Sequence, residues 1–440
     1  MKKKLTPNLL FFILSAVSIS VFLIEFSIFG RETGKSLFFG DPSDSFMDFF
    51  NVISCIATGR PYSCGGLFIY PPFVAIMMFP FLKLIPYSVI STNMRWFAAF
   101  DDIPIKYTVN MGNTMRLSES GVLSLLLFMF LAILAVAFLT AAIHKGKFSE
   151  NLFLVFIVLM SGGFLFEYER ANTIILAVIF LLIFILFKDS KNAFLRELAL
   201  IALACATGIK VYPAVFGLLL LRDKRWKDAI RTAIYGILIM FLPFLLFGGR
   251  SSISTLIHTL SSSNSGTFST GLSYKVDLTN ALRTLGLIFG WTDQTVIDIG
   301  GKLSYALVLI AIVPVCTVKK EWKAVAIVAL AVVMTPAFNF YYALSYLVIP
   351  LIVFLKAKET GKVSYLYAIL FAILLSPAFI VTIDEINQTS TGQYGLSVMS
   401  IIQNLLSVTI YLWMIAEGWV QFVRNRIKKP AISDDTAGVV

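Results

Sequence analysis

The chain has 440 residues, of which 58% are hydrophobic and only 14% charged, and its formal net charge is +11. Ordinary soluble domains are nearer half apolar and a quarter charged, so this composition excludes a soluble enzyme and predicts a protein that crosses a membrane many times. The lysine and arginine residues stand in short clusters between apolar runs, which is the positive-inside pattern. The positive charge therefore indicates orientation in a membrane and argues against a nucleic-acid partner.

Apolar runs recur along the whole chain, and several are long enough for a hydrocarbon core of about 30 Å. They are 9–29, 122–143, 151–166, 173–187, 234–247 and 365–383. The first follows three lysines and has no small-residue cleavage site, so we predict a retained first helix and not a signal peptide. Because no sizeable soluble segment remains between the runs, 1–440 is predicted to be one all-α polytopic membrane domain.

The basic clusters predict the path of the chain through a cell membrane. They lie at 145–147, 188–196, 222–231, 319–323, 356–362 and 424–429. If all face the cytoplasm, both termini are cytoplasmic and about twelve helices cross. The polar segments 30–119 and 248–302 are then outside, the second as a flexible, serine-rich loop.

The first outer segment, 30–119, contains an apolar stretch that is not expected to cross the membrane, because the number of crossings between two cytoplasmic segments must be even. This stretch, 67–86, includes Pro71, Pro72, Pro80 and Pro86, which break helices and remove backbone donors. We predict that it lies at the outer interface or re-enters the membrane. The same segment holds Cys55 and Cys64, for which a disulfide and two free thiols are both open.

Lys210 lies in the middle of another apolar stretch, 198–221, which starts and ends at cytoplasmic clusters. The stretch is therefore predicted to be a broken pair of short helices that turns around near 208–213. A charge at membrane depth is tolerated where it faces a cavity, so Lys210 is a candidate for binding phosphate. The alternative is a lysine that snorkels to the interface from a short helix.

Acidic residues gather in the first outer segment, at Asp41, Asp44 and Asp48. Asp44 and Asp48 are four residues apart, so on a helix they would share a face and act as general base and orienting partner. The alternative is that they cap and solubilise a helix that enters the loop. Carboxylates at a membrane surface, followed by the apolar Tyr70-Pro71-Pro72-Phe73, suggest chemistry on a lipid-borne substrate.

Five motifs in this order resemble glycosyltransferase family 87, over about residues 40–230. They are Asp44-x3-Asp48-Phe49-Phe50-Asn51, Gly59-Arg60-Pro61-Tyr62, Tyr70-Pro71-Pro72, Glu169-Arg170-Ala171-Asn172 and Gly208-Ile209-Lys210-Val211-Tyr212-Pro213. The resemblance implies a GT-C-like fold whose first outer loop carries an acidic catalytic residue and interfacial helices. It also implies a sugar donor linked to polyprenyl phosphate. The family usually has glycine or glutamine-like residues at positions 169–171, so the sugar stays open, as does the choice between the two aspartates.

The resemblance assigns roles to eight residues. Asp44 and Asp48 are the catalytic candidates; Lys210 and Arg170 would hold the donor phosphate; Tyr70, Glu169, Asn172 and Tyr212 would contact substrate. Two of these have alternatives: Arg170 pairing with the neighbouring Glu167 or Glu169, and Tyr212 serving in packing.

The reaction predicted is an inverting transfer of a mannose-like hexose or pentose to a lipid or cell-envelope glycan on the outer face. No residue is predicted to bind a metal, although a divalent cation near Asp384 and Glu385 stays open. The rival function is a transporter or flippase of lipid-linked saccharide. A transporter predicts broken helices in both halves of the chain, whereas 198–221 is the one such run in the sequence.

Overall fold

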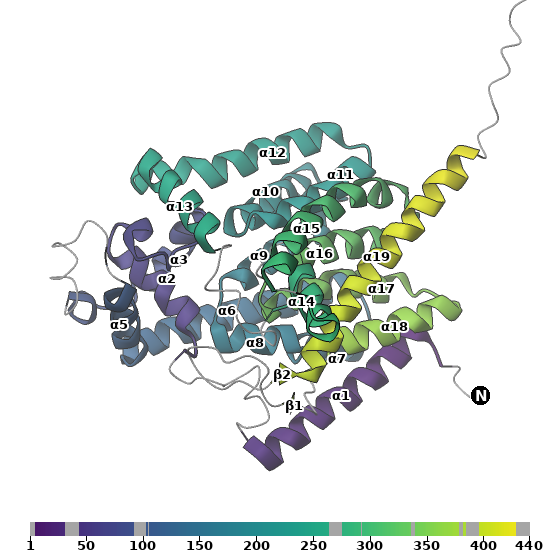
Figure 1. Cartoon of the computed structure of the whole chain (residues 1–440), viewed down its shortest axis with the longest axis horizontal. Helices are drawn as coiled ribbons and strands as arrows, with labels where there is room; N and C mark the ends of the chain where they lie inside the picture. Colours follow the sequence, from purple (N-terminus) through teal and green to yellow (C-terminus); the bar gives the residue numbers. More distant parts are fainter. Residues whose placement is uncertain are drawn as a thin grey trace, which may run out of the picture.

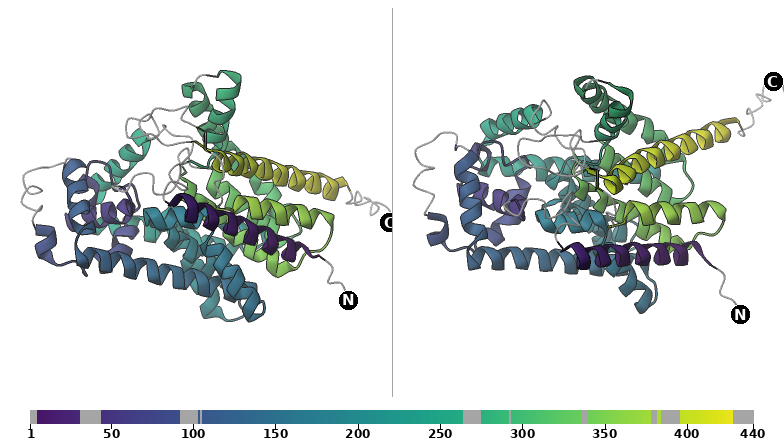
Figure 2. Two further views of the ribbon diagram at one scale, coloured as in Figure 1. Left: turned by 90° about the horizontal axis from the view of Figure 1, so that it is seen from below. Right: turned by 60° about the horizontal axis from the view of Figure 1, so that its bottom comes forward.

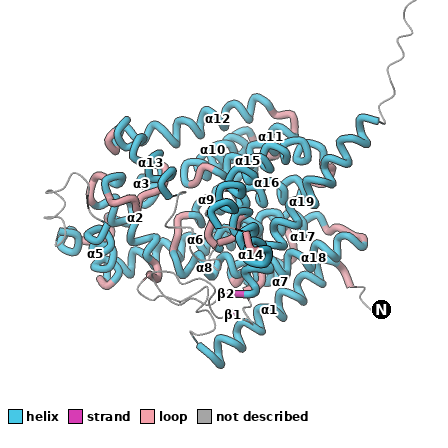
Figure 3. Tube along the Cα trace, in the orientation of Figure 1, coloured by secondary structure: helices cyan, strands magenta, loops and turns pink. Residues whose placement is uncertain are grey.

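The computed structural model of the chain describes residues 5–30, 44–91, 103, 105–263, 275–291, 293–335, 339–377, 382–383 and 396–427. The described residues form helices almost throughout, with one pair of two-residue antiparallel strands, β1 (Thr382–Ile383) and β2 (Leu396–Ser397) (Figures 1 and 3). The predicted all-α class is thereby confirmed apart from this short pair.

In chain order, the helices of the first half are α1 (Pro7–Phe29), α2 (Met47–Ala57), η2 (Pro61–Ser63), α3 (Phe73–Leu82), α5 (Ile105–Arg116), α6 (Glu119–His144), α7 (Phe148–Leu159), α8 (Gly162–Arg170), α9 (Ile174–Phe187), α10 (Ala193–Ile209), η3 (Tyr212–Gly217) and α11 (Leu218–Arg222). Those of the second half are α12 (Trp226–Phe241), η4 (Leu242–Leu246), α13 (Gly249–Ser263), α14 (Leu278–Phe289), α15 (Asp293–Thr317), α16 (Glu321–Met334), η6 (Tyr341–Leu347), α17 (Val348–Ala357), α18 (Lys362–Leu374) and α19 (Val398–Ile427).

Several helices are long and apolar enough to cross a membrane. Among the described residues five meet this condition, namely α1, α6, α12 together with η4, α15 and α19. The pair α7 and α8, bent by 57°, adds a sixth if it forms one span. The protein is therefore a multi-pass membrane protein, and the count of twelve crossings stays a prediction because the other apolar helices are shorter.

Helix α1 illustrates how the sequence sets these elements. The hydroxyl of Thr6 accepts a hydrogen bond from the backbone N–H of Leu9 at 3.2 Å, and Pro7 occupies the first turn, where its missing N–H costs nothing. The helix ends at Gly30, whose φ of 55° favours glycine. Large apolar side chains along α1 are exposed, as expected for a helix that faces lipid.

Helix α16 forms the centre of the fold. Every residue from Trp322 to Met334 is buried. It packs against α15, α17 and α19 as well as η6, and from Ala324 onward it is apolar on all sides, so it needs such a complete cover. Because α16 is central, the C-terminal helices α15, α17 and α19 pack around it and share one core with it.

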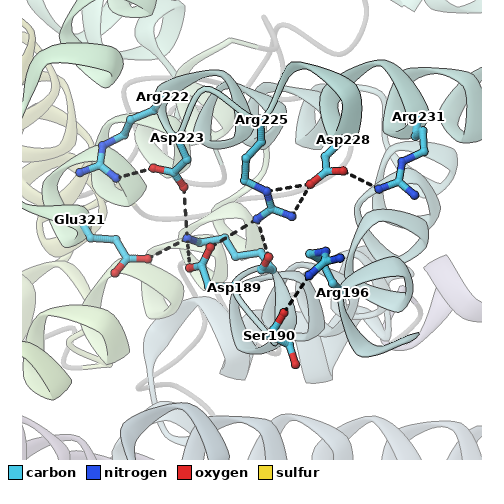
Figure 4. Close-up of polar contacts among 10 residues, drawn as sticks. Asp189, Ser190, Arg196, Arg222, Asp223, Arg225, Asp228, Arg231 and Glu321 are labelled. Carbon is cyan, nitrogen blue, oxygen red and sulfur yellow. Dashed lines mark hydrogen bonds and ion pairs between the residues drawn. The ribbon is translucent and has the colours of Figure 1, made fainter. Parts of the chain in front are cut away.

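Four of the basic clusters lie at one end of the molecule, among them 356–362, where Glu359 binds Lys320 at 2.5 Å. The buried ammonium of Lys188 binds Glu321 at 3.0 Å and Asp223 at 3.6 Å, and Arg222 donates to the carbonyl of Lys319 at 3.2 Å. The ion pairs continue along the start of α12 (Figure 4). Burial alone would lower the pKa of Lys188, but the charges of Glu321 and its other acidic neighbours outweigh burial and raise it.

The chain termini of the described fold lie at this same end. The side-chain amide of Asn8 donates to the carbonyl of Leu355 at 2.8 Å, and the hydroxyl of Tyr365 donates to the carbonyl of Leu5 at 2.6 Å. The N-terminal end of α1 and the C-terminal end of α19 point the same way, while α2, α3 and α5 lie at the opposite end (Figure 2). The described parts of the first polar segment, 44–91 and 105–116, and these four basic clusters are thus on opposite sides of the molecule.

Two segments differ in form from what the sequence suggested. The segment 248–302, predicted as a flexible loop, is mostly helical where it is described, as α13, α14 and the start of α15. Partly buried Ile253 and Leu256 on α13 pack on the core, so apolar spacing outweighed the serine content. Cys55 and Cys64 are both buried free thiols, not a disulfide.

Within 67–86, α3 has ten residues, a length of about 15 Å, or roughly half the hydrocarbon core. Within 198–221, α10 ends at Ile209, and η3 with α11 leads back toward the start of α10. Arg225, just after α11, donates to the carbonyl of Lys188 and to Asp189 at the head of α10. Lys210 and Val211 therefore form the break of a helical hairpin.

Candidate active site

Asp48 lies in the first turn of α2, where the free backbone N–H groups of a helix favour a carboxylate. Asp44 is not on this helix. It belongs to a turn that ends at Phe46, whose φ of 64° prevents the helix from starting earlier. The expectation that Asp44 and Asp48 share one helical face is therefore wrong.

The two aspartates are joined by Arg170, the last residue of α8. Its Nη2 donates to Oδ1 of Asp48 at 2.5 Å, and its Nη1 donates to Oδ2 of Asp44 and to the Asp44 carbonyl. Arg170 thus pairs with carboxylates of the first polar segment and not with its neighbours Glu167 and Glu169. The side chain of Asp48 is 18% exposed and that of Asp44 is 50% exposed, so Asp48 is the more enclosed of the two.

A tight turn between α8 and α9 brings Arg170 and Asn172 to Asp48. Ala171 has φ 49°, and its N–H donates to the carbonyl of Glu167 at 2.7 Å. Glycine adopts this left-handed conformation at lower cost than alanine. The side chain of Asn172 accepts from the N–H of Ile174 at 3.0 Å, which fixes its amide at the start of α9.

Asn172 connects Asp48 to Tyr70. Its Nδ2 donates to Oδ2 of Asp48 at 2.7 Å and lies 3.2 Å from the hydroxyl of Tyr70, to which it also donates. Both carboxylate oxygens of Asp48 are therefore oriented, one by Arg170 and one by Asn172. Each oxygen still has a lone pair for a further donor.

Lys210 completes the group. Its Nζ lies 4.2 Å from the centroid of the Tyr70 ring, a cation–π contact. Within the part of the chain that the structure describes, the ammonium has no hydrogen-bond or ion-pair partner, although the charges of Asp48 and Glu167 act on it. A cation in this position is available to an anionic ligand.

Two further predicted residues lie beside this group. The hydroxyl of Ser45 donates to Oε1 of Glu169 at 3.2 Å, and the N–H of Phe46 donates to the Glu169 carbonyl at 2.7 Å. Glu169 thereby anchors the turn that precedes Asp48. The ring of Tyr212 meets that of Tyr346 edge-on, with the centroids 6.1 Å apart.

Sequence reasoning missed three buried residues here. Glu167 was considered only as a partner of Arg170, yet it is fully buried one helical turn before it. Tyr342 and Tyr346 come from η6, which is far along the chain from the other residues of the group. A carboxylate inside an apolar run was the one sequence signal for Glu167.

Asp277 forms a separate buried polar centre at the start of α14. Its carboxylate accepts from the N–H of Asn280 at 2.7 Å and from the N–H of Asn339 at 3.3 Å, which joins α14 to the segment before η6. Burial raises the pKa of Asp277 to about 7. These contacts are typical of a structural cap.

Two other features carry no chemistry of their own. Leu330, Pro350, Phe371 and Met414 help to line a small apolar cavity between α16, α17, α18 and α19, which offers neither a carboxylate nor an ammonium. Three or more His, Cys, Asp or Glu side chains in a metal-binding arrangement do not occur among the described residues. The candidate pair Asp384 and Glu385 lies outside the described residues.

Comparison with known proteins identifies the family. The family model of glycosyltransferase family 87 matches residues 68–336. The chain belongs to glycosyltransferase family 87. The match includes Tyr70, Arg170, Asn172 and Lys210, and it begins after Asp48, which the contacts above bring to the same place. The resemblance expected from the motifs is confirmed, and it extends further toward the C-terminus than they indicated.

As a member of family 87, the protein is a membrane glycosyltransferase. The comparison with curated proteins gives no match, and neither does the comparison with solved structures.

Proposed function

We propose that this glycosyltransferase moves a sugar from a polyprenyl-phosphate donor to a lipid or cell-envelope glycan acceptor, with inversion at the donor carbon. The observation that carries the proposal is the line of contacts from Asp48 through Asn172 and Tyr70 to Lys210. Within the described residues it provides, in a single group, one oriented carboxylate and one cation without an ion-pair partner. Such a transfer requires a base for the acceptor hydroxyl and a positive charge for the departing phosphate.

Asp48 is the proposed general base. It would take the proton of the acceptor hydroxyl as the oxocarbenium-like transition state forms. Arg170 and Asn172 hold its two oxygens, so the carboxylate is oriented before the substrate arrives. Asp44 is more exposed than Asp48, and of Arg170 and Asn172 it contacts Arg170. We propose that Asp44 assists by binding the same guanidinium.

Lys210 is the proposed donor phosphate ligand. Its contact with Tyr70 leaves the N–H groups of the ammonium free to donate. Arg170 was the other candidate for phosphate, but two carboxylates already engage it, so we propose that it acts mainly by holding Asp48. Tyr70, Tyr212, Glu169 and Asn172 remain the proposed contacts of a hexose or pentose.

The proposed architecture is GT-C-like, with about twelve membrane crossings. The protein is proposed to lie in the cell membrane with both termini in the cytoplasm. The support for this orientation is the separation of four basic clusters from 44–91 and 105–116, the described parts of the first polar segment, at opposite ends of the molecule. Residues 30–119 would then form the outer catalytic loop, and α3 would lie at the outer interface.

Orientation predicts the result of cysteine labelling in intact cells. With the native cysteines replaced, a membrane-impermeant thiol reagent should label Tyr87→Cys from outside, because this exposed position lies in 30–119. Phe194→Cys, similarly exposed but within the basic cluster at 188–196, is the matched control and should react only after permeabilisation. Labelling of Phe194→Cys in intact cells, with Tyr87→Cys protected, would refute the orientation.

A donor panel tests the proposed activity. The purified protein in nanodiscs should release polyprenyl phosphate from a polyprenyl-phosphate hexose or pentose when an acceptor extract is present, and should leave nucleotide sugars unused. Consumption of a nucleotide sugar alone would contradict the proposed donor. Movement of the lipid across the membrane without loss of its sugar would favour the rival function, a transporter or flippase.

A further inference from the structure

The motif Gly59-Arg60-Pro61-Tyr62 has no part in the proposed chemistry, although its last residue lies beside the candidate site. Tyr62 belongs to η2, and its side chain is buried. Its hydroxyl donates a hydrogen bond of 2.9 Å to the backbone carbonyl of Tyr70 in the interior of the protein. Breaking a buried hydrogen bond leaves a polar group without a partner, so such a bond holds the two segments in place. Tyr62 therefore fixes the backbone at Tyr70.

The backbone at Tyr70 depends on this contact because it lies outside helix α3. The first hydrogen bonds of α3 go to the carbonyls of Pro71 and Pro72, and the Tyr70 carbonyl precedes them. Neither proline has an N–H of its own with which to hold the chain after Tyr70. The hydroxyl of Tyr62 is thus an anchor for the residue directly before the two prolines.

The ring of Tyr62 is itself held on two sides. It stacks on Phe244 of η4, with the centroids 5.4 Å apart and 26° between the planes, and it meets Phe68 edge-on at 5.2 Å. The Phe68 ring in turn contacts the Tyr70 ring at 5.8 Å. Aromatic pairs in such arrangements are stabilising beyond the area that they bury. Because η4 continues α12, the stack joins Tyr62 to a helix long enough to cross a membrane.

The position of Tyr70 matters because its side chain contacts both parts of the candidate site. Its ring lies 4.2 Å from the Nζ of Lys210, and its hydroxyl accepts from Asn172, which also binds Asp48. A cation–π contact requires the cation to lie over the face of the ring. A shift of the Tyr70 backbone would therefore move the ring away from Lys210.

We infer that Tyr62 is a positioning residue for the donor site: its hydrogen bond to the Tyr70 carbonyl holds the Tyr70 ring against Lys210, where the donor phosphate binds. The inference rests on the proposed role of Lys210. It assigns Tyr62 to donor binding and not to proton transfer, because Arg170 and Asn172 already orient the two oxygens of Asp48.

The test is a double-mutant cycle on the binding of polyprenyl phosphate, the lipid that the proposed reaction releases whatever its sugar, to purified protein in nanodiscs. Tyr62→Phe keeps the stacked ring and removes the hydroxyl, so loss of one hydrogen bond should raise Kd about two- to ten-fold. The kcat of transfer at saturating donor should stay close to that of the parent. In the Lys210→Met background the same substitution should leave Kd unchanged, because the contact through which Tyr62 acts is gone.

Tyr411→Phe is the matched control. Tyr411 on α19 is also buried, and its hydroxyl donates to the carbonyl of Leu307 on α15 at 3.4 Å. Each variant loses one buried hydrogen bond, so each should lower Tm, but Kd should rise in Tyr62→Phe alone. Phe244→Leu removes the ring on which Tyr62 stacks; it serves if Tyr62→Phe does not fold, and it should raise Kd in the same way.

The two possible failures are distinguishable. An unchanged Kd in Tyr62→Phe, with binding weakened in Lys210→Met, overturns the role of Tyr62 and leaves the proposed donor site intact. Losses that add in the double variant, or an equal loss in Tyr411→Phe, overturn it as well, since Tyr62 would then act otherwise than through Lys210. If Lys210→Met binds like the parent, the phosphate role itself fails, and the inference fails with it.

Discussion

Asp48→Asn should reduce sugar transfer by about 10²–10⁴-fold, the usual cost of removing a general base. An asparagine can keep an oxygen toward Arg170, so the variant should fold and insert, but its amide cannot accept the acceptor proton. The measurement is the initial rate of polyprenyl phosphate release by purified protein in nanodiscs. The reaction is compared at saturating donor, so that a binding effect is not mistaken for a chemical one.

Asp44→Asn is the matched control for Asp48. It removes a carboxylate that contacts the same guanidinium but is more exposed and has no contact with Asn172 among the described residues. Its loss of rate should be much smaller, because it acts only by orienting Arg170. Near-parent activity in Asp48→Asn, in Asp44→Asn and in the double variant would refute the assignment of the base to this pair.

Lys210→Met should weaken binding of the polyprenyl-phosphate donor by roughly 1.5–3 kcal/mol, the range for hydrogen bonds to charged groups. This corresponds to an increase in Kd of about 10- to 150-fold. Methionine keeps much of the apolar stem that lies against Tyr70 and deletes only the charge. Lys210→Arg should retain part of the affinity, because a guanidinium also donates to phosphate.

Lys83→Met is the control, because it removes a positive charge in a different segment, 30–119. Lys83 lies just after α3, with its Nζ 4.9 Å from the centroid of the Phe79 ring, so it resembles Lys210 in its local contact but not in its surroundings. Donor affinity should be close to that of the parent. Equal affinity in Lys210→Met and the parent would mean that Lys210 only snorkels, and Arg170 would become the leading phosphate ligand.

The sequence was sufficient to predict the class of fold, and most of the residues it singled out lie close together in the structure. A charge inside an apolar run at Lys210 and a carboxylate at Asp48 are unusual within a membrane protein, and each indicated function by itself. Their proximity could not be derived, because Asp48, Asn172 and Lys210 are far apart in the chain. The resemblance to a family, and not a local pattern, predicted that they meet.

Local details were predicted less well, for reasons that particular residues illustrate. Four-residue spacing suggested that Asp44 and Asp48 share a helix, but the left-handed conformation of Phe46 separates them. Glu167 and Glu169 are the acidic residues closest to Arg170 in the sequence, which suggested them as its partners. The turn at Ala171 instead directs Arg170 to Asp44 and Asp48. Tertiary contacts override sequence proximity for long, charged side chains.

Photocrosslinking with a polyprenyl-phosphate sugar that carries a photoreactive group near its phosphate tests the central claim most directly. The adducts are mapped by peptide mass spectrometry, with excess unmodified donor as competitor. Competable adducts should fall on the peptides that contain Tyr70 and Lys210–Tyr212, and Lys210→Met should diminish them. Competable adducts confined to the apolar cavity between α16, α17, α18 and α19, with none at Tyr70 or Lys210, would contradict the assignment of the donor site.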